Sequence, residues 1–429
     1  MDAHVTESPD SPADLQDPAG GTRAASSDGP GPPRTPPHRR HRLRWAALAA
    51  AVTVLVATGT GWAFYKKLNG NIRTDNVTQH ELARHESERP TEGPQDAQDI
   101  LLIGSDDRGG DNGEYGEDSG TQRSDTAILL HLAADRRSAT AVSIPRDLMA
   151  QIPSCTRSDG SSTKAQLAQF NWSFQFGGAA CTIRTVEEMT GVRIDHHIVL
   201  DFVGFKKMVD AVDGVEVCLT KPVNDHAAHL VLPAGRQTLR GEDALGYVRA
   251  RKSLGDGSDT ERMGRQQGFL GALVKKVQSN GVLLNPARLY PLLDAATGSL
   301  TTDKGLASLS GLYELVHSMR GIPADRIQFL TVPRQQYRYD HNRDELVQPD
   351  ADKLFARLRT DRPVTVQPPE STADGVPTGA GQTTAPDRKA TTGTPGDGAS
   401  DGPGESNPPS PADAGPAFPG TTADHGVCG

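Results

Sequence analysis

The amino-acid sequence predicts an α/β layered domain that follows a single membrane-spanning helix in a chain of 429 residues. An uncharged apolar stretch lies near the N-terminus, and the middle of the chain alternates between strand-like apolar runs and segments with helical spacing. Both ends are rich in Pro, Gly, Ser and Thr, so they cannot bury enough apolar surface to fold. We therefore expect one large domain over residues 99–360, a polar stalk over 66–98, and disordered segments over 1–44 and 361–429.

The apolar stretch at residues 45–65 reads WAALAAAVTVLVATGTGWAFY and carries no charge. At about 1.5 Å of rise per residue, it would cover roughly the 30 Å of a bilayer core. A long N-terminal extension precedes it, which favours an uncleaved anchor over a cleaved signal peptide. Lys66 and Lys67 follow the stretch, but more basic residues precede it: Arg34, Arg39, Arg40, Arg42 and Arg44. The positive-inside rule then places the N-terminus in the cytoplasm and everything beyond the helix outside the cell membrane.

The middle of the chain supplies the elements of the predicted α/β domain. Strands are expected at ILLI, AILLHLA, TAVSI, HHIVLDF and VEVCLT, and helices at residues 182–190, 202–214 and 259–279. Because strands and helices alternate along the chain, a layered arrangement of helices over a sheet is favoured.

Composition limits the function classes. The formal net charge of −9 disfavours a nucleic-acid-binding protein, because such proteins usually present a basic surface. The arginine-rich run before the apolar stretch is better explained by membrane topology. Four cysteines occur, and none has a zinc-type spacing. In an exported domain disulfides are expected, and Cys155 and Cys181, which flank a loop-rich segment, are the pair that we favour; Cys218 and Cys428 stay unassigned.

Acidic and basic residues gather at the ends of the apolar runs. Asp106 and Arg108 follow the first run, Arg123 and Asp125 precede the second, and Arg146 follows the third. A guanidinium group binds phosphate oxygens in pairs, and several arginines converge without repulsion only around an anion. Carboxylates beside such arginines are expected where Mg²⁺ also contacts the phosphate. A surface ion pair is the ordinary alternative for any one of these residues, but their shared position at strand ends favours a phosphate site.

A second basic cluster lies further along the chain. Arg249 and Arg251 alternate along an expected strand end and would therefore face the same side. Arg262 and Gln266 are one turn apart on an expected helix and share a face. Together the two clusters indicate stabilisation of charge on a transferred phosphoryl group.

These residues fall within motifs that resemble the LytR–CpsA–Psr family in the same order. The motifs are LLIGSDDR, RSDTAILL, VSIPRD, FNWSFQFGG, TVEEMTGVRIDHHIVLDFVGF, MVDAVDGVEV and ALGYVRARKSLGDGSDTERMGRQQ. The resemblance is strong over residues 99–274 and weaker to about 358. It implies a three-layer α/β/α sandwich with a central mixed sheet and a long apolar pocket for a polyprenyl chain. The activity it implies is transfer of an anionic glycopolymer from a polyprenyl-pyrophosphate carrier to peptidoglycan.

The resemblance also implies roles for individual residues. Asp106 and Asp125 match the Mg²⁺ ligands, and Arg146 matches the arginine that is critical for activity. Asp106 is also the residue expected to take the proton of the acceptor hydroxyl. The remaining positions match the pyrophosphate-binding set and its neighbours: Arg108, Arg123, Arg249, Arg251, Arg262 and Gln266.

Two departures and two alternatives accompany this interpretation. The loop between Asp106 and Asp125 is longer than usual, and Gln169 stands where the family often has a lysine, so Lys164 or Lys252 would have to compensate. The same residues would serve a pyrophosphatase that uses water as the acceptor. A non-catalytic, membrane-bound transcriptional attenuator is the other alternative, but the short Pro-rich cytoplasmic segment has no helix-turn-helix pattern.

Overall fold

The computed structural model of the chain divides into two compact units, Met1–Thr60 and Gly61–Gly429. The described residues are 38–106, 124–250, 254, 259–278, 286–367 and 416–425.

The N-terminal helix, α1 (His38–Asn71), contains the apolar stretch. Within the described part of the chain, it is the one helix long and apolar enough to cross a membrane. Two threonines of the apolar stretch donate to the carbonyl oxygen four residues earlier, Thr53 to Ala49 at 2.8 Å and Thr58 to Val54 at 2.7 Å. Because both hydroxyl groups are bonded within the helix, they are compatible with an apolar surrounding.

In the second unit, the described strands form a nine-stranded mixed sheet in the order β1-β12-β7-β2-β3-β4-β13-β17-β16. The pairs β2–β7 and β4–β13 are parallel, whereas β2–β3 and β3–β4 are antiparallel. The strands span Arg73–Thr74 (β1), Gln98–Ser105 (β2), Ser124–Leu132 (β3), Ala139–Ile144 (β4), His196–Leu200 (β7), Leu300–Thr302 (β12), Ile327–Thr331 (β13), Thr365–Gln367 (β16) and Ala417–Thr422 (β17).

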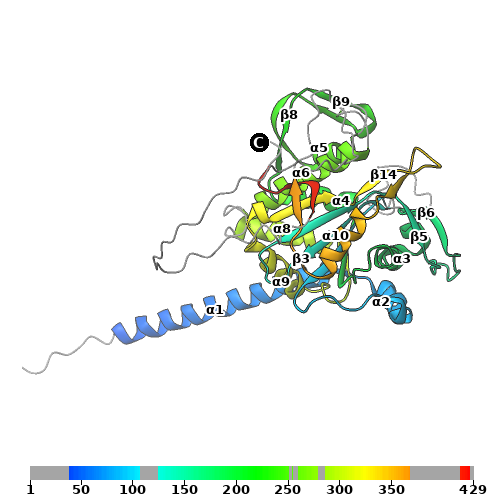
Figure 1. Ribbon diagram of the computed structural model, residues 1–429. Helices are drawn as coiled ribbons and strands as arrows, with labels where there is room; N and C mark the ends of the chain where they lie inside the picture. Colours follow the sequence, from blue (N-terminus) through cyan, green and yellow to red (C-terminus); the bar gives the residue numbers. More distant parts are fainter. Residues whose placement is uncertain are drawn as a thin grey trace, which may run out of the picture. The chain divides into compact units, whose positions relative to one another are not determined.

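Helices cover both faces of the central strands (Figure 1). On one face, Leu101 packs in a core with Ile183 of α3 (Trp172–Thr190) and Leu354 of α10 (Asp350–Arg359). On the other, Ile100 packs with residues of α6 (Asp259–Gln278) and α9 (Leu309–Arg320). Neighbouring residues of β2 thus serve opposite layers, as the alternation of side chains along a strand requires. The prediction of an α/β/α sandwich with a mixed sheet is confirmed.

A smaller lobe with its own core follows β7 in the chain. It comprises α4 (Phe202–Ala211), α5 (Gly241–Arg249) and two antiparallel strand pairs. The pairs are β8 (Val215–Leu219) with β11 (Gly235–Leu239), and β9 (Val223–Asp225) with β10 (Leu230–Leu232). Fully buried Phe269 joins α6 to this core, so α6 links the lobe to the sheet.

A disulfide joins α3 to the loop after β5 (Met149–Ile152), which pairs with β6 (Gln166–Gln169). The bonded pair is Cys155–Cys181, the pair favoured from the sequence, with Cα atoms 5.7 Å apart. Gly177 makes the close approach possible, because a Cβ there would lie 3.0 Å from the Cβ of Cys181 and 3.1 Å from that of Cys155. Cys218 is also disulfide-bonded, and Cys428 lies outside the described residues.

The prediction of a polar stalk over residues 66–98 is corrected by the structure, because this segment belongs to the folded unit. Leu68 and Ile72 are buried, and β1 pairs with β12. Helix α2 (Asn76–Arg84) follows, capped by the carboxylate of Asp75, which accepts from the backbone N–H of Thr78 at 2.9 Å. The segment reads as polar because only scattered positions face the core, which the composition does not reveal.

The prediction of a disordered segment over residues 361–429 is also corrected in part. Strand β17 inserts between β13 and β16, and Phe418 is 3% exposed within the core shared by α3 and α10. A strand held mainly by backbone hydrogen bonds needs few apolar residues, so its sequence, AFPGTT, does not stand out in a Pro- and Gly-rich tail. Residues 368–415 lie outside the described part of the chain.

The described residues of the second unit also form a few further helices and strands. They are α8 (Pro286–Ser299), β14 (Arg334–Gln336), β15 (Asp344–Leu346) and the short 3₁₀ helices Glu86–Glu88, His226–Ala228 and Ala324–Arg326.

Candidate functional site

Three neighbouring strands bring the first predicted residues to one edge of the sheet. Asp106 follows the end of β2, Asp125 is the second residue of β3, and Arg146 comes two residues after β4. Because β3 is antiparallel to both β2 and β4, the end of β2, the start of β3 and the end of β4 lie together. The apolar runs thus position the charged residues by burying the strands between them.

A β-bulge places Asp125. Ser105 pairs with Ser124 and Gly104 pairs with Thr126, so Asp125 is the extra residue on β3. Such a bulge turns a side chain away from the regular pleat of the sheet. Gly104 suits this distortion, because a Cβ there would lie only 3.2 Å from the Cβ of Thr126.

Arg146 is held between two carboxylates. Its Nη1 donates to Oδ1 of Asp125 at 2.9 Å, and its Nε donates to Oδ2 of Asp147 at 3.3 Å. Burial alone would lower the pKa of Arg146, but the charges of Asp125 and Asp147 outweigh burial and raise the pKa. The guanidinium is therefore permanently charged and fixed in direction.

The first turns of α6 bring further charged residues to the same place. Arg262 is 5% exposed, and its Nη2 lies 2.5 Å from Oδ1 of Asp259. One turn later, the side-chain amide of Gln266 donates to the carbonyl oxygen of Val248 at 3.1 Å. As the sequence predicts, Arg262 and Gln266 share one helix face.

Residues from β3, the end of β4 and α6 line a single small cavity. Among them are Asp125, Arg146, Asp259, Arg262 and Gln266. The space left between their atoms is about 10 Å³, roughly enough for one water molecule. Ion pairs thus fill most of this cavity, and both the phosphate site and the long apolar pocket stay predictions.

Arg249 is not among the residues that line this cavity. It ends helix α5, so the predicted strand end is wrong at this position, and its guanidinium carbon lies 4.6 Å from the centre of the Phe202 ring. The helix forms because acidic residues in its first turn and Arg249 in its last complement the helix dipole. Arg108, Arg123 and Arg251 lie outside the described residues.

A second group of arginines lies at this site and was not predicted from the sequence. The hairpin β14–β15 contributes Arg343, whose Nη1 lies 3.7 Å from Oδ1 of Asp147. The same carboxylate oxygen accepts a hydrogen bond from the side-chain amide of Gln169 at 2.8 Å. From the hairpin's first strand, Arg334 lies 2.5 Å from Asp344. The signal in the sequence is the basic segment RQQYRYDHNRD, which resembles an ordinary polar loop.

The pKa of Asp344 shows that the charged groups of the hairpin and the cavity lie close together. Burial raises its pKa, the contact with Arg334 opposes this rise, and the nearby charges of Asp259 and Asp147 add to it. Because carboxylates from α6, β15 and the β4–β5 loop influence one another, the hairpin and the cavity form one electrostatic unit.

The β14–β15 hairpin contributes a cation near Gln169, the residue that stands where the family often has a lysine. Where the family often has a lysine, this chain has a neutral amide that donates to Asp147, and Arg343 is a second cation beside that carboxylate, in addition to Arg146. Lys164 is exposed, and Lys252 lies outside the described residues. Arg343 thus places a cation beside Asp147 from an element that the sequence did not suggest.

Whether Mg²⁺ could bind at this site depends on the oxygen ligands that the chain provides there. The described residues contain no group of three or more His, Cys, Asp or Glu side chains that could hold a metal ion. Asp106 and Asp125 lie at the adjoining ends of β2 and β3. Mg²⁺ commonly takes one or two carboxylates and completes its shell with water and substrate phosphates. Two carboxylates therefore fit Mg²⁺ that arrives with a phosphate ligand.

Known proteins share this fold. The LytR-Csp2A-Psr enzyme from Actinomyces oris superposes with a TM-score of 0.50 at 23% identity, covering 63% of this chain and 93% of that structure. Protein gbs0355 from Streptococcus agalactiae gives 0.52 at 20% identity, covering 62% and 87%.

Curated relatives extend the comparison to sequence. The cell wall biosynthesis protein LcpA of Corynebacterium glutamicum is 32% identical over 309 residues, which cover 66% of this chain and 58% of LcpA. The probable cell wall biosynthesis protein LcpB of the same species is 39% identical over 228 residues, or 52% of this chain and 51% of LcpB. The chain thus matches about half the length of both. The polyisoprenyl-teichoic acid–peptidoglycan teichoic acid transferase TagT of Bacillus subtilis is 28% identical over 298 residues, covering 66% and 85%.

The profile of the LytR_cpsA_psr family matches residues 64–360, a range that holds the whole cavity and the β14–β15 hairpin. This chain belongs to the LytR_cpsA_psr family.

Proposed function

We propose that this chain is a membrane-anchored phosphotransferase that moves an anionic glycopolymer from a polyprenyl-pyrophosphate carrier to peptidoglycan outside the cell. The observation that carries the proposal is the cavity at the sheet edge, where Arg146 and Arg262 meet beside Asp125. The names of TagT and LcpA, a teichoic acid transferase and a cell wall biosynthesis protein, support the same class of reaction.

Charge balance supports a pyrophosphate ligand that brings Mg²⁺. In the described site, Arg146, Arg262, Arg334 and Arg343 form ion pairs with five aspartates, so these pairs leave no excess positive charge for a ligand. A pyrophosphate diester adds two negative charges, which one Mg²⁺ would match. Asp106 and Asp125 would hold the Mg²⁺, which when bound would supply positive charge to the phosphate oxygens.

An exchange of partners opens the small cavity for the ligand. The ion pair between Arg146 and Asp125 breaks, and Arg146 binds phosphate oxygens instead. Arg262 likewise leaves Asp259 and binds phosphate oxygens. Each guanidinium exchanges one anionic partner for another, so neither is left buried with its charge uncompensated. Asp125 is then free to serve as a metal ligand.

The reaction follows from this placement. A hydroxyl group of the peptidoglycan acceptor attacks the phosphorus that bears the glycopolymer, and the new P–O bond forms as the bond to the bridging oxygen breaks. Asp106 takes the proton of the hydroxyl group, and polyprenyl phosphate leaves with the bridging oxygen. Arg146 and Arg262 offset the charge that develops on the leaving phosphate.

The test uses the full chain in nanodiscs with a polyprenyl-pyrophosphate-linked sugar, peptidoglycan and Mg²⁺. Arg146→Ala and Asp125→Ala should each lower turnover by at least about 100-fold, because Arg146 would offset charge on the leaving phosphate and Asp125 would hold the Mg²⁺. The control is Arg326→Ala, which removes an exposed arginine at the start of β13.

Product analysis separates the outcomes. Sugar attached to peptidoglycan supports the transferase, whereas release of sugar phosphate at the same rate without peptidoglycan would indicate a pyrophosphatase. Turnover retained in both cavity variants would reject this cavity as the active site.

A further inference from the structure

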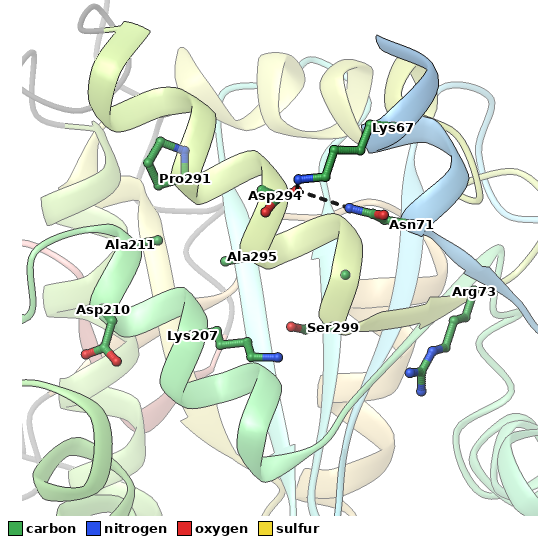
Figure 2. Close-up of a pocket in the computed structure, with 11 residues that line it drawn as sticks. Lys67, Asn71, Arg73, Lys207, Asp210, Ala211, Pro291, Asp294, Ala295 and Ser299 are labelled. Atoms are coloured by element: carbon green, nitrogen blue, oxygen red, sulfur yellow. Dashed lines mark hydrogen bonds and ion pairs between the residues drawn. The ribbon is translucent and has the colours of Figure 1, made fainter. Parts of the chain in front are cut away.

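A second, larger cavity lies on another part of the folded unit, between the end of α1, β1, α4 and α8 (Figure 2). Its volume is about 730 Å³, and none of its residues belongs to the cavity at Arg146. Three cations line it: Lys67, Arg73 and Lys207.

The cavity lies close in sequence to the apolar stretch, which ends at Tyr65. Within the folded unit, Phe64 meets the ring of Tyr290 edge to face, with centres 5.0 Å apart. One turn later, Lys67 contacts Asp294 at 3.1 Å, and Asn71 donates to the same carboxylate oxygen at 3.1 Å. Helix α8 therefore packs alongside the last two turns of α1, and the cavity begins just past the stretch expected to cross the bilayer.

The acids in the cavity are already engaged. Asp294 accepts from Lys67 and Asn71, as the dashed lines in Figure 2 show, and Oδ1 of Asp210 accepts the backbone N–H of Gly241 at 2.8 Å. Lys67 is thus paired with Asp294, and Arg73 and Lys207 are the other two cations of the cavity. Arg73 and Lys207 are exposed, and neither has an ion pair or hydrogen bond from its side chain to another described residue.

These two cations come from different elements. Figure 2 shows Lys207 extending from α4 toward Ser299 at the end of α8, with Arg73 on the far side of Ser299. The helices α4 and α8 touch at this point, because a Cβ on Gly204 would lie 2.6 Å from the Cβ of Ser299. The helix that carries Lys207 is thus tightly packed against α8, while the side chains of Lys207 and Arg73 are open to solvent.

We propose that this cavity binds the phosphate group of an anionic membrane lipid through Arg73 and Lys207. An arginine fork and a lysine ammonium are both common phosphate-binding groups. Exposed cations attract anions weakly in solution, but basic residues held next to a surface that contains anionic lipid bind its phosphate groups more strongly. The cavity would bind the domain to the surface in which its carrier substrate is dissolved.

The experiment uses the full chain in detergent micelles, titrated with phosphatidylglycerol, phosphatidylcholine or inorganic phosphate, with bound lipid counted by native mass spectrometry. The paired variant is Arg73→Gln with Lys207→Gln. The matched control, Arg137→Gln with Lys221→Gln, removes the same two residue types from exposed positions outside the cavity. Thermal unfolding checks that all three proteins are equally folded.

We expect the unaltered chain to retain phosphatidylglycerol in preference to phosphatidylcholine, the paired variant to bind it at least tenfold more weakly, and the control to be unchanged. Equal retention of both lipids, or equal binding by the paired variant, would overturn the proposal. So would full displacement of phosphatidylglycerol by an equal concentration of inorganic phosphate, which would assign the cavity to free phosphate. No donor or acceptor of the transfer reaction is present, so this result stands apart from the proposed activity.

Discussion

At the scale of single residues, Asp147 links the predicted site to the arginines that were not predicted from the sequence. It accepts from Gln169 and Arg146 and lies beside Arg343. Charges at the ends of apolar runs are conspicuous in a sequence, so Asp125 and Arg146 could be predicted. Arg343 could not, because it lies in a polar segment where arginines are common.

This arrangement predicts that Arg343 supplies the cation that Gln169 does not. Arg343→Gln should lower turnover about tenfold, because a charge-assisted contact contributes about 1.5–3 kcal/mol. Gln169→Lys, which puts an ammonium beside Asp147, should restore most of this loss in the double variant. Turnover of the two single variants and the double variant gives the coupling between the positions. Equal losses in the presence and absence of Lys at position 169 would show that Arg343 acts independently.

A second prediction at this scale concerns pH. Burial alone would raise the pKa of Asp75, but hydrogen bonds from His197 and Thr78 lower it from 3.8 to about 2. The folded state therefore holds the proton less tightly than the unfolded state. The resulting stability, about 2 kcal/mol, is fully present above pH 3.8 and is lost as the pH falls toward 2.

The measurement is the free energy of unfolding of the native chain and of Asp75→Asn in detergent, at pH 6 and at pH 2.5. We expect the variant to be less stable at pH 6 and the difference to shrink at pH 2.5. Because asparagine is also a good N-cap, the variant keeps the capping hydrogen bond, and a difference that is the same at both pH values would contradict the assignment to the charge of Asp75.

At the scale of elements, α3 depends on two glycines at its kink. Gly178 has φ = +60° and ψ = −149°, a conformation that is essentially confined to glycine. Gly178→Ala should therefore lower the free energy of unfolding by about 1–3 kcal/mol. Gly264→Ala is the matched control, because Gly264 is exposed in α6 with open space around it, and there alanine should be neutral or stabilising. Denaturant unfolding compares the two, and an equal effect would argue against strain at Gly178.

Element prediction succeeded where periodicity was clear. The helix expected at residues 259–279 is α6, Asp259–Gln278. The strand expected at Arg249 is a helix, because apolar residues in ALGYV satisfy both a short buried strand and one buried helix face. Short strands such as β1, with two residues, carry too little pattern to be predicted from sequence.

At the scale of the whole molecule, the sheet depends on residues far beyond the range that the family profile covers. Phe418 of β17 packs into the core between the sheet and the helices α3 and α10. Phe418→Ala should lower the free energy of unfolding by about 3–5 kcal/mol, whereas Pro419→Ala, at an exposed position of the same strand, should have a much smaller effect. Thermal unfolding of the full-length variants measures this, and equal midpoints would mean that β17 adds little to the core.

The overall architecture could be predicted because alternating apolar runs specify layers, whereas the completeness of the sheet could not. Pairing between β13 and β17 joins Gln328 to Thr422, positions that no local pattern connects. The same applies to the segment around Leu68 and Ile72, which packs on distant elements. Long-range pairing of backbone groups leaves little trace in composition.

The place of β17 also has a consequence for how molecules meet one another. With β17 removed, β13 would present a row of unsatisfied backbone donors and acceptors beside the apolar side chains of Phe329 and Leu330. An open border of this kind is a template for strands from a neighbouring copy. A version cut at residue 360 would therefore tend to self-associate and precipitate, even though every residue of the cavity at Arg146 would still be present.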